Sequence, residues 1–202
     1  MISESRYWKD ELLKVARKLA GRTKQTRWSE ASLVALEKDV FVSFYAIRKL
    51  IEGQKITSHL AKRMIEISCY PNTGRLVHIL NRRDVHEFYD LSSKKRARVS
   101  LSFLCNQMIH SYVFLPGFNT KNRLASILFN SDYQRNKSLF QLPIRSTIQL
   151  LQAVGHDYSS AFRVVFDDKQ NDYKFVDIPH NSTTRSRPLE RKTSHQTRRV
   201  EL

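Results

Sequence analysis

The sequence has little cysteine and glycine and no long apolar run, and each shortage excludes a class of protein. The two cysteines, Cys69 and Cys105, lie in apolar stretches, which argues against a disulfide framework and favours two buried thiols. Neither has a Cys or His partner at the spacing of a zinc site, so we expect no metal and no cofactor. Five glycines in 202 residues also argue against a glycine-rich phosphate-binding loop.

Membrane and secretion signals are also missing from the sequence. No stretch reaches the roughly 18 consecutive apolar residues that a membrane-spanning helix needs. Residues 1–11 lack the basic start and the apolar segment of a signal peptide. We therefore expect a cytoplasmic protein with no membrane among its partners.

The sequence carries a large excess of positive charge. It has 35 Lys and Arg against 19 Asp and Glu, a net charge of +16 and a pI near 10.1. Such a field attracts polyanions, which could be a nucleic acid, an anionic membrane surface or an acidic protein. Aromatic residues near several basic clusters could stack unpaired bases, which favours RNA over DNA. The residues predicted to bind nucleic acid are Arg82, Arg83, Lys94, Lys95, Arg96 and Arg98.

Hydrophobic spacing predicts helices in the first 118 residues. Apolar residues recur at steps of three and four over residues 3–20, and over residues 30–52 with Ser29 as the N-cap. A third helix is expected from Thr57 or Ser58 until Pro71, and a fourth from about residue 98 to 115. Residues 75–90 are compatible with either a short strand or the end of a helix.

The pattern changes after residue 120. Short β-like runs are expected at Leu124–Asn130 and Ser138–Leu142, then a helix from Pro143 to Val154 and a hairpin at residues 161–178. The sequence thus predicts an α+β fold. A helical bundle (1–118) would be followed by antiparallel hairpins with one helix packed on it (119–179) and a disordered basic tail (180–202).

Asn106 and His110 are the residues most suggestive of chemistry. They lie four apart in the predicted fourth helix, so both would project from one face, beside an apolar stripe. In a cleft, His110 could shuttle a proton while Asn106 positions it; otherwise His110 is a semi-buried histidine bonded to Asn106. On the second helix, Arg48 could pair with Glu37 or Glu52 and bind phosphate against the His110 face; the alternative is an ordinary solvated flank.

The Asn106-x-x-x-His110 spacing resembles the HEPN group of helical nucleases and nucleotide-binding domains. In that group the motif is Arg, four to six residues, then His; here residues 103–105 occupy the Arg positions without an Arg. The resemblance covers about residues 30–115. It implies a helical fold and ribonuclease chemistry with Asn106 and His110 in the motif.

Two functional hypotheses follow. One is a nucleic-acid-binding protein that acts as a metal-independent ribonuclease in a toxin or defence setting, with His110, Asn106 and Arg48 as its catalytic residues. The other is a non-catalytic interaction or nucleic-acid-binding subunit of a larger complex. A homodimer or a protein partner is compatible with both.

Overall fold

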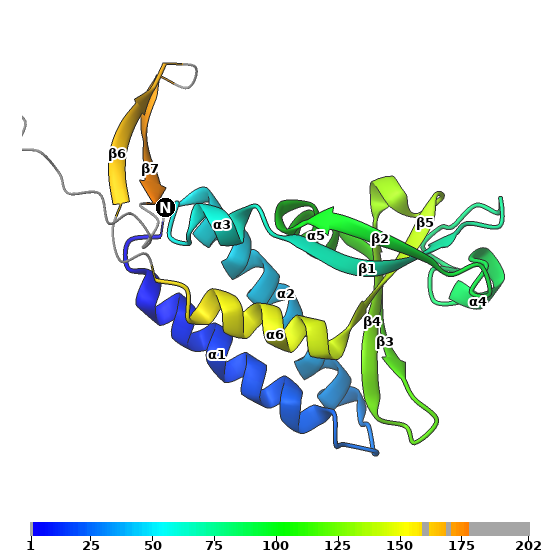
Figure 1. Cartoon of the computed structure of the whole chain (residues 1–202). Helices are drawn as coiled ribbons and strands as arrows, with labels where there is room; N and C mark the ends of the chain where they lie inside the picture. The colour runs from blue at the N-terminus through cyan, green and yellow to red at the C-terminus, as the bar shows by residue number, and fades with distance from the viewer. Residues whose placement is uncertain (1, 159–161, 169–170, 178–202) are drawn as a thin grey trace, which may run out of the picture.

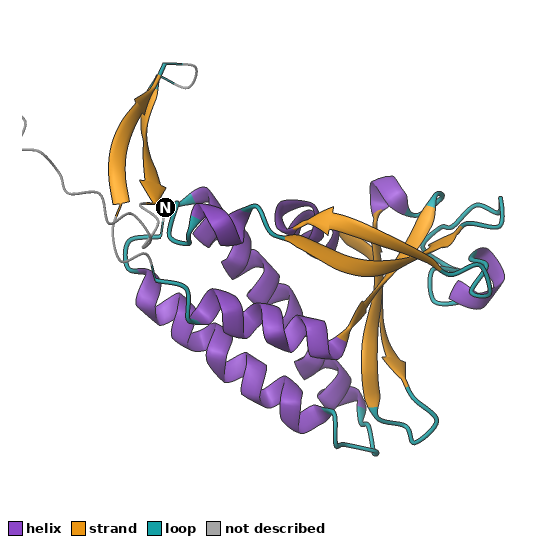
Figure 2. Ribbon diagram, viewed as in Figure 1, coloured by secondary structure: helices purple, strands orange, loops and turns teal. Residues whose placement is uncertain are grey.

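The computed structural model describes residues 2–158, 162–168 and 171–177. Within them the chain is α+β, as the sequence predicts, with helices packed on one face of a five-stranded antiparallel sheet (Figures 1 and 2). The elements are α1 (Ser5–Arg22), α2 (Glu30–Glu52), α3 (Ser58–Ala61), β1 (Met64–Pro71), α4 (Val85–Phe88), β2 (Lys95–Ser100), α5 (Leu101–Ile109), β3 (Ser111–Phe118), β4 (Leu124–Ser131), the 3₁₀ turn η1 (Asp132–Gln134), β5 (Ser138–Pro143), α6 (Ile144–Gly155), β6 (Phe162–Asp167) and β7 (Asp172–Asp177).

The long helices form where the sequence predicts them. The Ser29 hydroxyl caps α2 by accepting a hydrogen bond from the backbone N–H of Ser32, and the Ser32 hydroxyl accepts one from the backbone N–H of Ser29. Helices α1 and α6 lie side by side (Figure 1). Their close approach depends on Gly155, because a Cβ there would lie 2.5 Å from the Leu13 side chain. A buried cluster from α1, α2, α5 and α6 covers one face of the sheet.

The sheet has the strand order β2-β1-β5-β4-β3, so β2 and β3 are its two edges. Alternate residues of each strand face the helices: Ile65 and Ile67 of β1 are buried in the core, and Phe129 of β4 joins them. The opposite face is covered at one end by the connection between β1 and β2. Its Val77 and Tyr89 lie in a second apolar cluster on that face.

The predicted third helix is wrong beyond its first turn. Only α3 is helical, and β1 begins at Met64. Ile65 and Ile67 are buried whereas Met64 and Glu66 are exposed, which is the two-residue period of a strand. The predicted fourth helix is also wrong at both ends, because residues 95–100 form β2 and residues 111–118 form β3, which leaves nine helical residues between them.

These strands change the expected organisation. Residues 1–118, predicted as a helical bundle, contain β1, β2 and β3, and the β3–β4 hairpin pairs Phe118 with Leu124 across the expected boundary. The helical stretch that the HEPN resemblance implies for residues 30–115 is interrupted by β1 and β2. No helix in the described ranges is long and apolar enough to cross a bilayer.

The later elements agree with the sequence prediction. β4, β5 and α6 form where the period changes, and β6 pairs with β7 as a hairpin. Within the described ranges β6 and β7 form a two-stranded sheet separate from the five-stranded one, and this hairpin projects from the body (Figure 1). The predicted tail, 180–202, lies outside the described residues.

Candidate nucleic-acid interface

The structure brings two of the three predicted catalytic residues together. Arg48 on α2 donates a hydrogen bond from Nη1 to Oδ1 of Asn106 on α5. Its Nε donates to Oε1 of Glu52 at 2.6 Å, so Glu52, rather than Glu37, is the ion-pair partner of Arg48. The carboxylate of Glu52 also accepts from Lys49 Nζ at 2.8 Å. Hydrogen bonds from Lys49 and Arg48 lower the pKa of Glu52, so this carboxylate remains charged and neutralises the guanidinium of Arg48.

His110 lies outside this cluster of hydrogen bonds. It is the C-cap of α5, with φ −102° and ψ 27°, and only its backbone N–H bonds to Asn106, at 3.0 Å to the carbonyl oxygen. Its imidazole is exposed and makes no hydrogen bond within the described ranges. The interpretation as a semi-buried histidine bonded to the Asn106 side chain is therefore wrong. His110 is open to solvent.

A polar hollow of about 230 Å³ lies along the β3 edge. The ring of Tyr112 in β3 has two guanidinium groups nearby: Cζ of Arg135 is 4.6 Å from its ring centre and Cζ of Arg82 is 5.7 Å away. Arg82 also donates to the Tyr112 carbonyl at 3.4 Å. The other wall comes from α2, whose Phe41 packs against Phe114 with ring centres 4.7 Å apart. The remaining lining residues are Glu37, Arg83, Ser111, Val113 and Leu115.

The second basic region is strand β2 with the residue before it. Lys94, Lys95, Arg96 and Arg98 are all exposed. In this strand Ala97 and Val99 pack against the helical core, so Arg96 and Arg98, with the opposite parity, project from the outer face. They lie opposite Ser68 and Glu66 of β1 in the register.

Arg98 also contributes to a hollow of about 300 Å³ between the β1–β2 edge and α6. Arg63 precedes β1 and lies on the same wall, while α6 supplies Ser146 and Gln149 opposite it. Arg63 and Arg98 are exposed, and Glu66 is the one acidic residue that lines this hollow. The positive surface of β2 therefore continues around the sheet edge toward α6.

The charges of the helical and sheet regions are arranged differently. In the helices, acidic residues neutralise cations, as in the pair of Arg22 Nη1 and Asp39 Oδ2 at 2.9 Å. Residues 53–131, which contain β1 to β4, hold 12 Lys and Arg but only four Asp and Glu. None of these 12 cations forms an ion pair with any residue that the structure describes. The positive charge is thus both concentrated and unneutralised on the sheet side.

The six predicted nucleic-acid-binding residues fall into two groups. Lys94, Lys95, Arg96 and Arg98 lie together at the β2 edge, whereas Arg82 and Arg83 lie at the β3 edge. Four strand spacings separate these edges, or roughly 19 Å. Sequence reasoning missed Tyr112, which lies in the stretch predicted as the fourth helix, and Arg135, which lies between the two predicted β-like runs. The contacts of Tyr112 with Arg82 and with Arg135 join three distant segments, so no local pattern could have revealed them.

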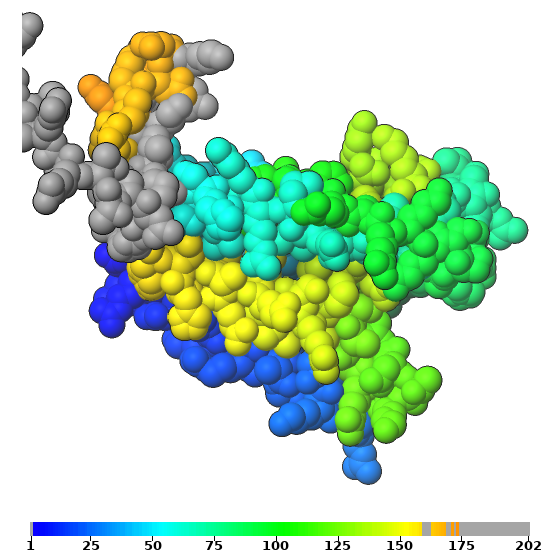
Figure 3. Space-filling model, in the orientation of Figure 1, coloured from blue at the N-terminus to red at the C-terminus, as the bar shows by residue number. Residues whose placement is uncertain are grey.

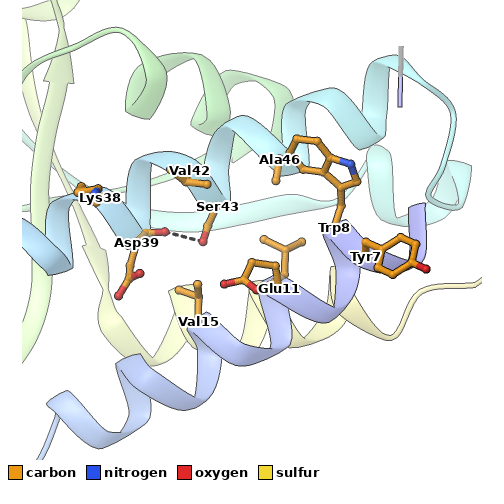
Figure 4. A pocket seen from close by; sticks show the side chains of 10 residues that line it. Tyr7, Trp8, Glu11, Val15, Lys38, Asp39, Val42, Ser43 and Ala46 are labelled. Atoms are coloured by element: carbon orange, nitrogen blue, oxygen red, sulfur yellow. Dashed lines mark hydrogen bonds between the residues drawn. The ribbon is translucent and has the colours of Figure 1, made fainter. Parts of the chain in front are cut away.

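A third hollow, of about 290 Å³, lies between α1 and α2 and has a different character (Figure 4). Trp8 and Val42 are among its apolar lining residues. The Ser43 hydroxyl donates to the backbone oxygen of Asp39 at 2.6 Å, so this polar group is satisfied within its own helix. The groove is mainly apolar, with Lys38, Glu11 and Asp39 as its charged lining residues, and it is separate from the basic regions of the sheet.

No family model, curated protein or solved structure matches the chain. Within the described ranges, no three His, Cys, Asp or Glu side chains are grouped where they could hold a metal ion.

Proposed function

We propose that the protein binds single-stranded nucleic acid, RNA in preference to DNA, through the cations of its sheet. The observation that carries this proposal is the unneutralised row of Lys94, Lys95, Arg96 and Arg98 along an exposed sheet edge. Cations without protein partners can neutralise phosphates without first breaking an ion pair, and each contact releases a counterion. The phosphate chain would follow β2 and the adjoining hollow at Arg63.

The β3 edge provides a second contact of a different kind. Guanidinium planes and tyrosine rings stack on unpaired bases, and Tyr112 with Arg82 and Arg135 offers both in one place. Stacking needs bases that are not already paired, which is why a single strand is favoured over a duplex. Arg83, exposed at the same edge, is placed to hold a phosphate beside such a base.

A charge-matched pair of variants tests the proposal. The first replaces Lys94, Lys95, Arg96 and Arg98 by alanine. The second replaces four exposed cations of the helical half, which form no ion pair with any described residue, by alanine: Arg17, Lys24, Arg27 and Lys38. Fluorescence anisotropy with a labelled oligouridine, its DNA counterpart and a duplex would measure Kd across a series of salt concentrations.

We expect the β2 variant to reduce the slope of log K against log salt by about 3, at about 0.7 per lost phosphate contact in a single strand. The control should retain nearly the slope of the unaltered protein. Equal losses in the two variants would mean that net charge alone attracts the polymer. The absence of binding at low salt would refute the proposal entirely.

A second candidate function, ribonuclease activity at His110, is favoured by one observation. Arg48 fixes Asn106 at the end of α5, and the exposed imidazole of His110 immediately precedes Ser111, which lines the β3 hollow. There His110 could exchange a proton with the 2′-hydroxyl or the leaving oxygen of a bound RNA. RNA cleavage in the presence of EDTA that is lost in His110→Ala, with Kd unchanged, would support this function; cleavage that survives the substitution would exclude it.

A further inference from the structure

The connection between β1 and α4 exposes three aliphatic side chains within five residues. Leu76 is 74% exposed, Ile79 is 66% exposed and Leu80 is 88% exposed. Single exposed aliphatic residues are common on protein surfaces, but a contiguous group usually marks a contact site. We call residues 75–83 the apolar loop.

The apolar loop is held in place by its own hydrogen bonds. The amide of Val77, itself a buried member of the second apolar cluster, donates to Asn136 Oδ1 at 2.8 Å. Asn81 accepts from the His78 amide at 2.8 Å and donates to the Leu76 carbonyl at 3.2 Å. The aliphatic side chains are therefore presented to solvent by a fixed turn.

The charges around these side chains are mainly positive, with Arg75, Arg82 and Arg83 in the loop and the exposed Asp84 directly after it. Arg75 and Arg83 flank the aliphatic residues and are exposed, and residues 67–83 contain no Asp or Glu. The loop lies at the outer end of the sheet, away from α1 and α6, as the ribbon and the space-filling view both show (Figures 1 and 3). Projecting aliphatic side chains between cations form the pattern that binds the interface of an anionic bilayer.

We infer that the apolar loop docks on an anionic membrane surface. Leu76, Ile79 and Leu80 enter the boundary between headgroups and acyl chains, while Arg75 and Arg83 contact lipid phosphates. Aliphatic side chains have no π-face for a nucleobase, and a projecting tip suits a deformable lipid layer better than a rigid protein surface. The net charge is compatible with an anionic membrane surface, and the expectation of no membrane partner depended on the lack of spanning runs and of a signal peptide, neither of which an interfacial contact requires.

This inference does not depend on nucleic-acid binding. Because Arg83 belongs to both proposed contacts, the test uses Leu76 and Leu80, which take no part in the proposed nucleic-acid contact. The full chain is sedimented with vesicles of phosphatidylcholine alone or mixed with phosphatidylserine. Leu76→Ser/Leu80→Ser is compared with Val34→Ser, which alters a half-exposed aliphatic residue on α2. Circular dichroism and thermal unfolding establish that each variant is folded, and oligouridine binding is measured in parallel.

We expect the unaltered protein to bind phosphatidylserine vesicles with an affinity that falls as salt rises. The double leucine variant should bind these vesicles at least about tenfold more weakly, since losing even one buried aliphatic side chain has that effect. Its affinity for oligouridine should remain unchanged, and the Val34→Ser variant should keep the vesicle affinity of the unaltered protein. Vesicle binding that survives loss of both leucines overturns the inference. So does light scattering that shows the unaltered protein to be a dimer and the leucine variant a monomer, because a second copy would then cover the loop.

Discussion

The buried ammonium group of Lys9 gives a stringent test of how the helical half is held together. Lys9 of α1 is only 2% exposed, and its Nζ donates a hydrogen bond to the backbone oxygen of Asp157, just beyond α6. The Asp157 carboxylate accepts from the Thr57 amide at 2.6 Å and from the Thr57 hydroxyl at 2.8 Å. Burial lowers the pKa of Lys9, and the charge of Asp157 opposes that shift. One residue therefore joins α1, the start of α3 and the end of α6.

Replacing Asp157 by alanine removes both side-chain hydrogen bonds to Thr57 and the strongest anionic influence on Lys9. Hydrogen bonds to charged groups contribute about 1.5–3 kcal/mol each, and water replaces part of what is lost. We expect the free energy of unfolding to fall by about 3 kcal/mol. In a chain of this size that corresponds to a decrease in Tm of roughly 6–12 °C.

Urea titration followed by circular dichroism would measure the loss, and a double-mutant cycle would assign its cause. Lys9→Met removes the buried charge while keeping the volume, so Asp157→Ala should cost less in that background. Asp84→Ala serves as the control, because Asp84 is exposed and makes no side-chain hydrogen bond within the described ranges. Equal costs for Asp157→Ala with and without Lys9→Met would refute the coupling, and a cost no larger than that of Asp84→Ala would refute the whole argument.

Two further predictions concern packing and thiol chemistry. Gly155→Ala should destabilise the protein by about 1–3 kcal/mol in thermal unfolding, because the new Cβ would overlap Leu13. Adding Leu13→Ala to this variant should recover part of that loss. An unchanged Tm for Gly155→Ala would contradict the close contact between α1 and α6. Burial raises the pKa of Cys105 from 9.0 to about 12, so the folded chain holds a proton that the unfolded chain loses above pH 9. That contribution to stability is present below pH 9 and declines between pH 9 and 12. Cys105→Ala should remove the decline, and in the native protein a thiol reagent should modify half-buried Cys69 but not Cys105.

The parts of the fold that the sequence predicts correctly are those whose signals are local. Helix α2 has its cap and its apolar stripe within one continuous segment, and α6 follows Pro143 directly. Strand β1 shows the opposite case. Leu60, Met64 and Ile67 happen to lie at helical steps, while Ile65 and Ile67 also fit a strand. The strand forms in place of a helix because this segment pairs with β2 and with β5, about 30 and 70 residues further along the chain.

The candidate site was predictable to a similar extent. The pairing of Arg48 with Glu52 follows from helical spacing, and the exposure of the β2 cations follows from charge. The geometry of His110 could not be predicted, because it depends on α5 ending at Ile109 so that Ser111 can pair with Ser131 of β4. The start of β3 therefore sets the geometry of His110, and an error in predicting the strand also leads to an error in placing the histidine.

The two uncovered sheet edges have a consequence for the behaviour of the protein at high concentration. An open edge offers free N–H and C=O groups to any other strand, and charged residues or proline discourage such pairing. Repulsion between copies would keep β2 edges apart, while β3 carries Pro116, which lacks an N–H, and has its Tyr112 carbonyl bonded to Arg82. Replacing the β2 cations by neutral residues should therefore make the protein prone to aggregate. An anionic polymer bound at β2 would neutralise the same cations, so it would itself have to shield the strand from pairing with another copy.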